Sequence, residues 1–169
     1  LADQRRSVKL RMRAMLREER VETPADAGTP WPKSWLAWLR ETTALDAHSR
    51  WVMDQHLADL ERVIKTIRAV EERMEAATHD DPLTQRLLSE KGVGLVTAVT
   101  MRAEIGSFRR FQSGKQLARY CAVTPKNVSS GNRQADGGII KAGHLPLRTV
   151  LIEAAHRLAR YVPQWQKFK

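Results

Sequence analysis

The sequence predicts an all-α or mainly α fold, in which a long helical hairpin or coiled coil precedes a compact helical domain. Apolar residues recur every three or four positions over residues 3–20, 46–77 and 145–161, which is the helical period. Glycines and prolines gather between these stretches rather than inside them. A glycine-rich segment near residues 128–143 leaves room for a loop or a small β-hairpin, with Ile139 and Ile140 as its apolar part. We expect a helical linker or coiled-coil region over residues 1–80 and a compact domain over residues 81–169.

The composition fits a protein of a reducing cytosol. No apolar run approaches the length of a membrane span, so no membrane partner is expected. The first twenty residues are basic and lack the apolar stretch of a secretory signal. The one cysteine, Cys121, excludes an intrachain disulfide framework and is expected to be a small buried apolar residue. Because the chain does not begin with Met, we interpret it as a piece of a longer polypeptide.

Positive charge is concentrated in the second half of the chain. Residues 1–85 hold 14 Lys and Arg against 15 Asp and Glu, a balance of −1. Residues 86–169 hold 15 Lys and Arg against four acids, a balance of +11. Such a half predicts a polyanionic partner, and DNA is the default one, because neutralising phosphates releases counterions. Charge alone gives no sequence specificity.

The residue 3–20 segment predicts an amphipathic helix with Val8, Met12, Met15 and Leu16 on one side and basic residues around the rest. Two interpretations stay open: a helix that lies on nucleic acid, or one with a solvated charged face. Residues 21–34 contain three prolines and a glycine and predict a linker. Trp31, Trp35 and Trp38 then align on one helical face, a pattern more typical of packing than of base stacking.

A long helix is expected from about Asp46 to Ala77, with no Gly or Pro inside it. Its apolar stripe follows heptad spacing: Met53, Leu57, Leu60, Ile64, Ile67 and Met74. This predicts a coiled coil or a helical hairpin, and a homo-oligomer through residues 46–77. The partner of the stripe is either a second copy or the residue 3–20 helix, and the sequence does not choose between them.

Several short motifs mark helix boundaries. Asp81 is a predicted N-cap with Pro82 at the first helical position. His79 beside Asp80 and Asp81 has no further ligand cluster, and the remaining histidines lack zinc-ligand spacing, so no metal site is expected in this chain. Later in the chain, "FRRFQSGKQLARYC" places Arg109 and Arg110 between two core phenylalanines. It then offers a capping box at Ser113 and Gln116, with Lys115 as a further candidate cation.

The stretch "LLSEKGVGLVTAVTMRAEIG" predicts a helix, a tight turn and a second helix from about Leu95. Gly92 is expected to end the first helix in a left-handed conformation, and Gly94 to let backbone approach a ligand closely. This pattern resembles a helix-hairpin-helix motif, which binds nucleic-acid phosphates without reading bases, and Lys91 and Thr97 are candidates to add to that contact. An ordinary helix–helix turn explains the same residues equally well.

The segment "VSSGNRQADGGIIKAGH", residues 128–144, joins paired serines to glycines and cations. A serine attacks phosphorus effectively when cations and N–H groups stabilise the transition state and a base accepts its proton. The cations available for this role are Lys126, Arg133, Lys141 and Arg148. For so short a motif taken alone, a surface turn is the more common explanation.

The order of these motifs resembles one known family. Residues 87–156 contain, in sequence, a G-hydrophobic-G-x-x-T-A turn, an E-I-G, an F-x-S-x-K-Q-L-A helix start, an S-G, an I-x-K-x-G and an L-R. The series is similar to the C-terminal domain of bacterial insertion-sequence transposases of the IS-one-ten/IS-one-sixteen class. These are Piv-like, DEDD, bridge-RNA-guided recombinases. The first helix and the long helix resemble the linker region of the same family.

The resemblance implies a DNA transposase fragment that binds DNA and a guide RNA and transfers phosphoryl groups through a serine. It also implies a bacterial cytoplasmic protein associated with the nucleoid. The family's serine precedes the glycine of the S-G motif, which assigns the nucleophile to Ser130, with Ser129 as the alternative. Divalent metal, Mg²⁺, is expected in an N-terminal RuvC-like domain, which this sequence does not contain, so the chain alone is predicted to be inactive. Leu95, Ala142 and His144 depart from the residues frequent in the family.

Two other functions stay open. One is a non-catalytic module that holds guide RNA or DNA, and the other is an oligomerisation element built on residues 46–77.

Overall fold

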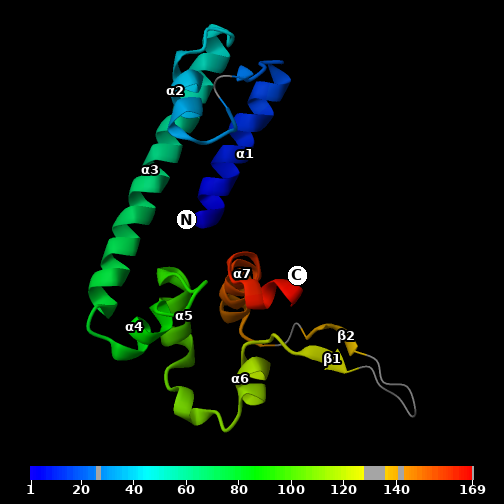
Figure 1. The fold of residues 1–169 in the computed structure, drawn as a ribbon. Coiled ribbons are helices and arrows are strands. Elements are labelled where there is room, and N and C mark those ends of the chain that lie inside the picture. Colours follow the sequence, from blue (N-terminus) through cyan, green and yellow to red (C-terminus); the bar gives the residue numbers. More distant parts are fainter. Residues whose placement is uncertain (26–27, 128–135, 141–142, 169) are drawn as a thin grey trace. The chain divides into compact units, whose positions relative to one another are not determined.

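The computed structural model describes residues 1–25, 28–127, 136–140 and 143–168. The chain divides into two compact units, Leu1–Val70 and Glu71–Lys169. The described residues are mostly helical, with one small two-stranded antiparallel sheet, so the mainly α prediction is confirmed (Figure 1). The domain division expected at residue 80 stays a prediction.

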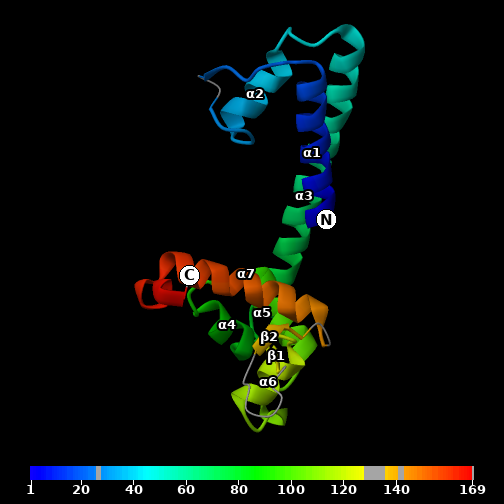
Figure 2. The same cartoon turned by 90° about the vertical axis from the view of Figure 1, so that its right-hand side faces the viewer.

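Unit 1 contains α1 (Ala2–Glu18), α2 (Lys33–Glu41) and the greater part of α3 (Ala47–Thr78), as Figure 2 shows. The bounds of α3 match the predicted long helix within a residue. Its start is fixed by Asp46, whose Oδ1 accepts a hydrogen bond of 2.7 Å from the backbone N–H of Ser49. That bond also holds the pKa of Asp46 below its usual value.

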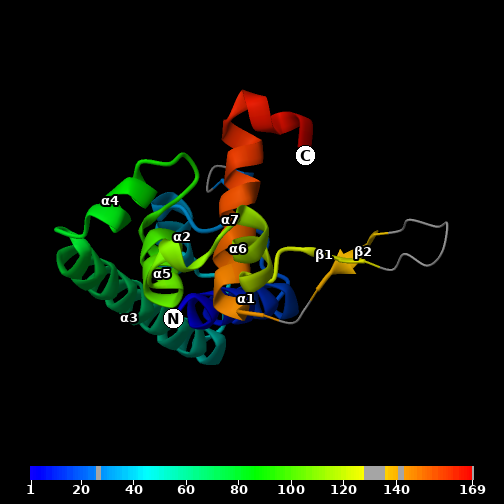
Figure 3. The same ribbon diagram turned by 90° about the horizontal axis from the view of Figure 1, so that it is seen from below.

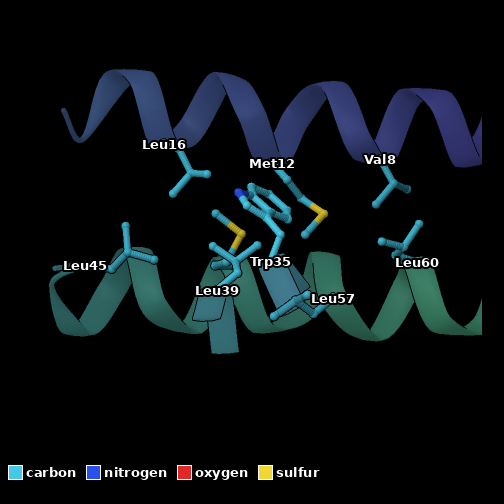
Figure 4. Packing of buried hydrophobic residues seen from close by; sticks show 9 residues of the cluster. Val8, Met12, Leu16, Trp35, Leu39, Leu45, Leu57 and Leu60 are labelled. Atoms are coloured by element: carbon cyan, nitrogen blue, oxygen red, sulfur yellow. The ribbon is translucent and has the colours of Figure 1, made fainter. Parts of the chain in front are cut away.

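The core of unit 1 forms where the apolar faces of α1, α2 and α3 meet. Figure 4 shows Val8, Met12 and Leu16 pointing from α1 toward α3, with Leu57 and Leu60 facing them. Met12 and Leu60 are 0% and 2% exposed. The first half of the α3 stripe therefore packs against the residue 3–20 helix of the same chain. Of the two partners considered for the stripe, a second copy or this helix, the structure shows the helix for that half.

The three tryptophans serve packing, as predicted, but Trp31 does not share a helical face with the other two, because α2 begins only at Lys33. Trp35 is 1% exposed, and its Nε1–H donates to Thr23 Oγ1 over 3.3 Å. Trp31 and Trp38 flank it with ring centroids at 4.9 and 5.8 Å.

Unit 2 consists of four helices, two 3-10 turns and a hairpin in its described part. The elements are α4 (Pro82–Leu88), α5 (Leu95–Ile105), η2 (Phe108–Arg110), α6 (Gly114–Tyr120), β1 (Pro125–Asn127), β2 (Asp136–Ile139), α7 (Leu145–Tyr161) and η3 (Pro163–Phe168). Helix α5 contacts both α4 and α7, and η3 turns back onto α7 (Figure 3). The core holds Ile105, Cys121 and Leu147, each 1% exposed or less, with Phe108 and Phe111 packed against them. The prediction that both phenylalanines and Cys121 serve the core is confirmed.

The short β-hairpin predicted for the glycine-rich segment is present. β1 and β2 pair antiparallel, with Pro125 opposite Ile139 and Asn127 opposite Asp136. The N–H of Ile140 extends the pairing by donating to Thr124 O over 3.0 Å.

Asp81 occupies the N-cap of α4, followed by Pro82, as predicted, but the Asp81 side chain caps no backbone N–H there. Instead Oδ2 accepts hydrogen bonds of 2.7 Å from Thr84 Oγ1 and from Arg102 Nε on α5. One expectation is wrong: Tyr161, the last residue of the predicted apolar helix over residues 145–161, is 71% exposed, and Val162, which follows the helix end, is buried instead.

Candidate nucleic-acid interface

The turn between α4 and α5 has the left-handed glycine that the sequence predicts, but Gly92 does not end the first helix, because α4 ends at Leu88 with Ser89 as its C-cap. Gly92 has φ +86°, in the left-handed region that favours glycine. Gly94 is the N-cap of α5 with φ −95° and ψ 175°, which is extended backbone. The helix then runs to Gly106, whose φ of +67° ends it. We call residues 91–94, together with the first turn of α5, the GVG turn.

Gly92 packs against α7. A Cβ on Gly92 would lie 3.0 Å from Leu158 Cγ, 3.1 Å from Ala154 O and 3.3 Å from Leu158 N. Two of these three atoms belong to the α7 backbone, which cannot rotate away as a side chain can. The absence of a side chain at Gly92 therefore lets α7 pack closely on the turn.

Gly94 lies beside a cation instead. The nearest atom to a Cβ built on Gly94 is one guanidinium nitrogen of Arg157, at 3.4 Å. No side chain caps α5 at Gly94, and the first N–H groups of an α-helix have no acceptor within the helix. An exposed Arg157 thus stands next to uncapped N–H groups and the positive end of a helix dipole, an arrangement that favours phosphate. The sequence analysis missed this role for Arg157, because 63 residues separate it from Gly94.

Lys91 and Thr97, the other two residues predicted at this turn, differ in how exposed their side chains are. Lys91 is exposed at the turn. Thr97 is 6% exposed, so its side chain lies in the interior of unit 2.

A second group of polar residues surrounds the base of the β-hairpin. His144 Nε2 lies 2.9 Å from Glu104 Oε2, and the His144 ring stacks on Tyr120 with centroids 6.1 Å apart. Tyr120 donates its hydroxyl to Glu104 O over 3.0 Å. The Arg110 guanidinium lies 4.4 Å from the centroid of the Tyr120 ring, a cation–π contact. These four residues form what we call the hairpin-base cluster.

Backbone contacts reinforce the same region. The N–H of His144 donates to Tyr120 O over 3.3 Å. Gly143 and Ala122 both have positive φ, +131° and +56°, and a Cβ on Gly143 would lie 2.6 Å from Ala122 Cβ. Only glycine fits at residue 143 when the hairpin is anchored this closely to the end of α6.

The remaining predicted cations are distributed over several elements of unit 2. Arg109, Lys115 and Lys126 are exposed on η2, α6 and β1, and Arg110 is exposed above its aromatic partners. Arg148, in the first turn of α7, is partly buried and has a guanidinium nitrogen with no hydrogen-bond partner. Ser129, Ser130, Arg133 and Lys141 lie outside the described residues.

Few acids neutralise this surface. In the described part of unit 2, the ion pairs are Arg86–Glu90, Arg102–Asp81 and His144–Glu104. None of the exposed cations assigned to the interface takes part in one. The described residues also contain no group of three or more His, Cys, Asp or Glu side chains placed to hold a metal ion.

The sequence of this surface matches a known family. The family model described as "Transposase IS116/IS110/IS902 family" matches residues 84–169, just over half of the chain. This chain belongs to that transposase family. The match begins in α4 and covers the GVG turn, the hairpin and α7, and α1, α2 and α3 precede it.

Individual transposases give the same result. The chain is 33% identical over 112 residues to a probable family 20 transposase of Pseudomonas aeruginosa, covering 64% of this chain and 33% of that protein. It is 32% identical over 127 residues to the transposase for insertion sequence element IS1111A of Coxiella burnetii, covering 75% and 35%. It is 31% identical over 141 residues to the putative transposase y4qE of Sinorhizobium fredii, covering 82% and 33%. The chain thus spans about a third of the length of these relatives. No helix in the described residues is both long and apolar enough to cross a membrane.

Proposed function

We propose that this chain is the DNA-backbone-binding and serine-bearing part of a transposase. The observation that carries the DNA contact is the position of Arg157 beside Gly94, next to the uncapped N-terminus of α5. Backbone N–H groups and a guanidinium together form hydrogen bonds with a phosphodiester without reading base identity. Lys91 extends the positive charge along the same turn.

The chemical step that the family resemblance implies is an attack of Ser130 on a DNA phosphodiester. The Ser130 Oγ–H bond breaks, an Oγ–P bond forms, and the P–O bond to the leaving deoxyribose oxygen breaks. The serine proton passes to a base, and the leaving oxygen takes up a proton. The developing negative charge would be stabilised by Arg133, Lys141 and Arg148, with Lys126 at the entrance to the hairpin.

The proposal assigns metal binding to another part of the whole protein. The described residues do not offer a set of side chains that fits a metal ion. On the grounds of family resemblance, Mg²⁺ is assigned to a RuvC-like domain of the whole protein, and no step of the reaction is derived through it. The guide RNA is a proposed partner on the same grounds of family resemblance.

The serine assignment is tested in a protein in which a RuvC-like domain precedes Leu1. Ser130→Ala should abolish strand exchange and the covalent protein–DNA adduct, whereas Ser129→Ala should retain both. If Ser130→Ala still exchanges strands, the nucleophile is a different residue. If neither variant nor the parent forms an adduct with a suicide substrate, the chain is a non-catalytic nucleic-acid-binding module.

The DNA contact is tested on the chain itself. Arg157→Gln and Gly94→Ala should weaken binding to duplex DNA and reduce its salt dependence, because each removes or blocks a phosphate contact. Arg86→Gln is the matched control, since Arg86 pairs with Glu90 on the surface of α4. Equal affinities for Arg157→Gln and Arg86→Gln would exclude the GVG turn as the DNA contact.

An oligomer through α3 is a second proposal, which a separate observation supports. Val70 is 42% exposed, and Ile67 and Met74 are partly exposed, on the part of the stripe that follows the core of unit 1. Ile67→Glu combined with Val70→Glu should reduce the sedimenting mass if this face joins two copies. Leu60 is unsuitable for that test because it is 2% exposed in the core, where a charge would unfold unit 1.

A further inference from the structure

Helix α1 carries a dense positive charge that the proposed contact at the GVG turn does not use. Residues 5–17, "RRSVKLRMRAMLR", contain six cations and no acid. The apolar side of the helix is occupied, because Val8, Met12 and Leu16 are buried against α2 and α3. The other side of the helix is therefore the only one on which a partner can bind.

Most cations of α1 are exposed and make no ion pair within the described residues. The exposed ones are Arg5, Arg6, Arg11, Arg13 and Arg17. Lys9 differs, since it is partly buried with its amine 4.6 Å from the centroid of the Trp31 ring. Burial, and to a lesser extent the neighbouring Arg5, lowers the pKa of Lys9.

Several arginines elsewhere in unit 1 are neutralised by carboxylates. Arg40 pairs with Glu61, Arg50 with Asp54 and Arg62 with Asp59. In the described residues, no cation of α1 takes part in an ion pair. Like charges four residues apart on a helix, such as Arg13 and Arg17, cost about 0.2–0.5 kcal/mol per pair. A helix that retains several such pairs is unfavourable alone and is stabilised when a polyanion binds it.

We propose that the exposed face of α1 binds the phosphodiester backbone of a nucleic acid, at a surface separate from the GVG turn. Arg6, Arg13 and Arg17 are seven and four residues apart, which places them on one side of the helix. With a rise of about 1.5 Å per residue, they span roughly 16 Å along the axis, a length that covers several phosphates of one strand. Arginine suits this role because its planar fork donates two hydrogen bonds to one phosphate.

The packing of α1 favours nucleic acid over an acidic membrane surface. A helix that lies on a membrane inserts an apolar face below the headgroups. Here that face is already in the core, and the large apolar side chains of α1 that remain exposed are Leu1 and Leu10, at 47% and 57%. Two leucines nine residues apart do not form an insertable face, whereas a purely cationic face is sufficient for phosphates.

The test compares two triple variants of the full chain. Arg6→Gln/Arg13→Gln/Arg17→Gln removes three charges from α1, and Arg62→Gln/Lys65→Gln/Arg68→Gln removes three exposed charges from α3 in the same unit. Glutamine has nearly the helix propensity of arginine, so both variants should keep the wild-type circular dichroism spectrum and urea midpoint. Binding to a 30-base-pair DNA duplex and to a single-stranded RNA of 30 nucleotides is then measured across salt concentrations.

For the α1 variant, the slope of log K against log salt should fall in magnitude by about 2.7 on a duplex or about 2.1 on a single strand, for three lost phosphate contacts. The nucleic acid that shows the larger loss is the one that α1 binds. Arg13→Gln alone should give about a third of the change, which secures the result if the triple variant folds poorly. The α3 variant should change little.

Equal affinities and slopes for the two triple variants would overturn the proposal. So would an α1 variant that loses binding to phosphatidylserine vesicles while keeping its affinity for both nucleic acids. Arg157→Gln, measured in parallel, separates this surface from the GVG turn. If the α1 variant loses nucleic-acid affinity and Arg157→Gln does not, the α1 surface is supported and the DNA contact at the GVG turn is excluded. If only Arg157→Gln loses affinity, the contact at the GVG turn is supported and the α1 surface is excluded.

Discussion

Replacing Gly92 with alanine tests the packing that holds the GVG turn against α7. The φ of +86° costs an L-residue about 1–2 kcal/mol. The new Cβ would also lie 3.1 Å from Ala154 O and 3.3 Å from Leu158 N, both backbone atoms of α7. Forcing such a contact in a packed interior costs about 1–3 kcal/mol. Together, Gly92→Ala should lower the free energy of unfolding by about 2–5 kcal/mol.

The measurement is urea unfolding followed by circular dichroism. With an m-value of about 2 kcal/mol/M for a domain of this size, the midpoint should fall by about 1–2.5 M. Gly114→Ala is the control, because a Cβ there meets no atom within 4 Å and its φ is not positive. A Gly92→Ala protein that unfolds within about 0.5 kcal/mol of Gly114→Ala would refute the packing argument.

Three further predictions concern stability and reactivity. Met12→Ala should lower the free energy of unfolding by about 2–5 kcal/mol, as measured by urea, because the side chain is 0% exposed in the unit 1 core. The hydrogen bonds that Asp81 accepts, chiefly from Thr84, lower the pKa of Asp81, so their stabilisation is present above its unfolded pKa and is lost as pH falls through the folded value. Thermal melts should therefore show wild type more stable than Asp81→Asn at pH 7, with the difference shrinking below about pH 4. Burial raises the pKa of the Cys121 thiol, so iodoacetamide at pH 8 should label it slowly in the native protein and quickly in urea, and equal rates would contradict its burial.

The helices that sequence reasoning placed well are those with a chemical signal at each end. Helix α5 runs from Leu95 to Ile105 between two glycines, and α7 begins beside Pro146. The hydrophobic period and the glycines and prolines at helix ends are local properties, so the sequence alone reveals them. The identity of the helix that packs on the α3 stripe is not encoded locally in the sequence. Choosing α1 over a second copy depends on how tightly two separate faces fit, as at Met12 and Leu60.

The site contacts that sequence reasoning missed all join residues far apart in the chain. Asp81 was assigned to its own helix by position, yet its carboxylate is held by Arg102, 21 residues away. Arg157 reaches Gly94 only because α7 packs on α5. A spacing pattern cannot report such pairs, since nothing in the intervening residues encodes them. The charge asymmetry between the two halves indicated a basic surface in unit 2. It did not indicate the basic face of α1, because the acids of α3 offset the cations of α1 in the net charge of the first half.

The hairpin-base cluster explains how a short hairpin on a helical unit is given a fixed orientation. A two-stranded hairpin is marginal by itself in water, so β1 and β2 depend on what holds their ends. One end follows Ala122, which packs on Gly143, and the other enters α7 at His144, which is tied to Glu104 and Tyr120. These contacts tie the hairpin to Glu104 of α5, to Tyr120 of α6 and to the start of α7.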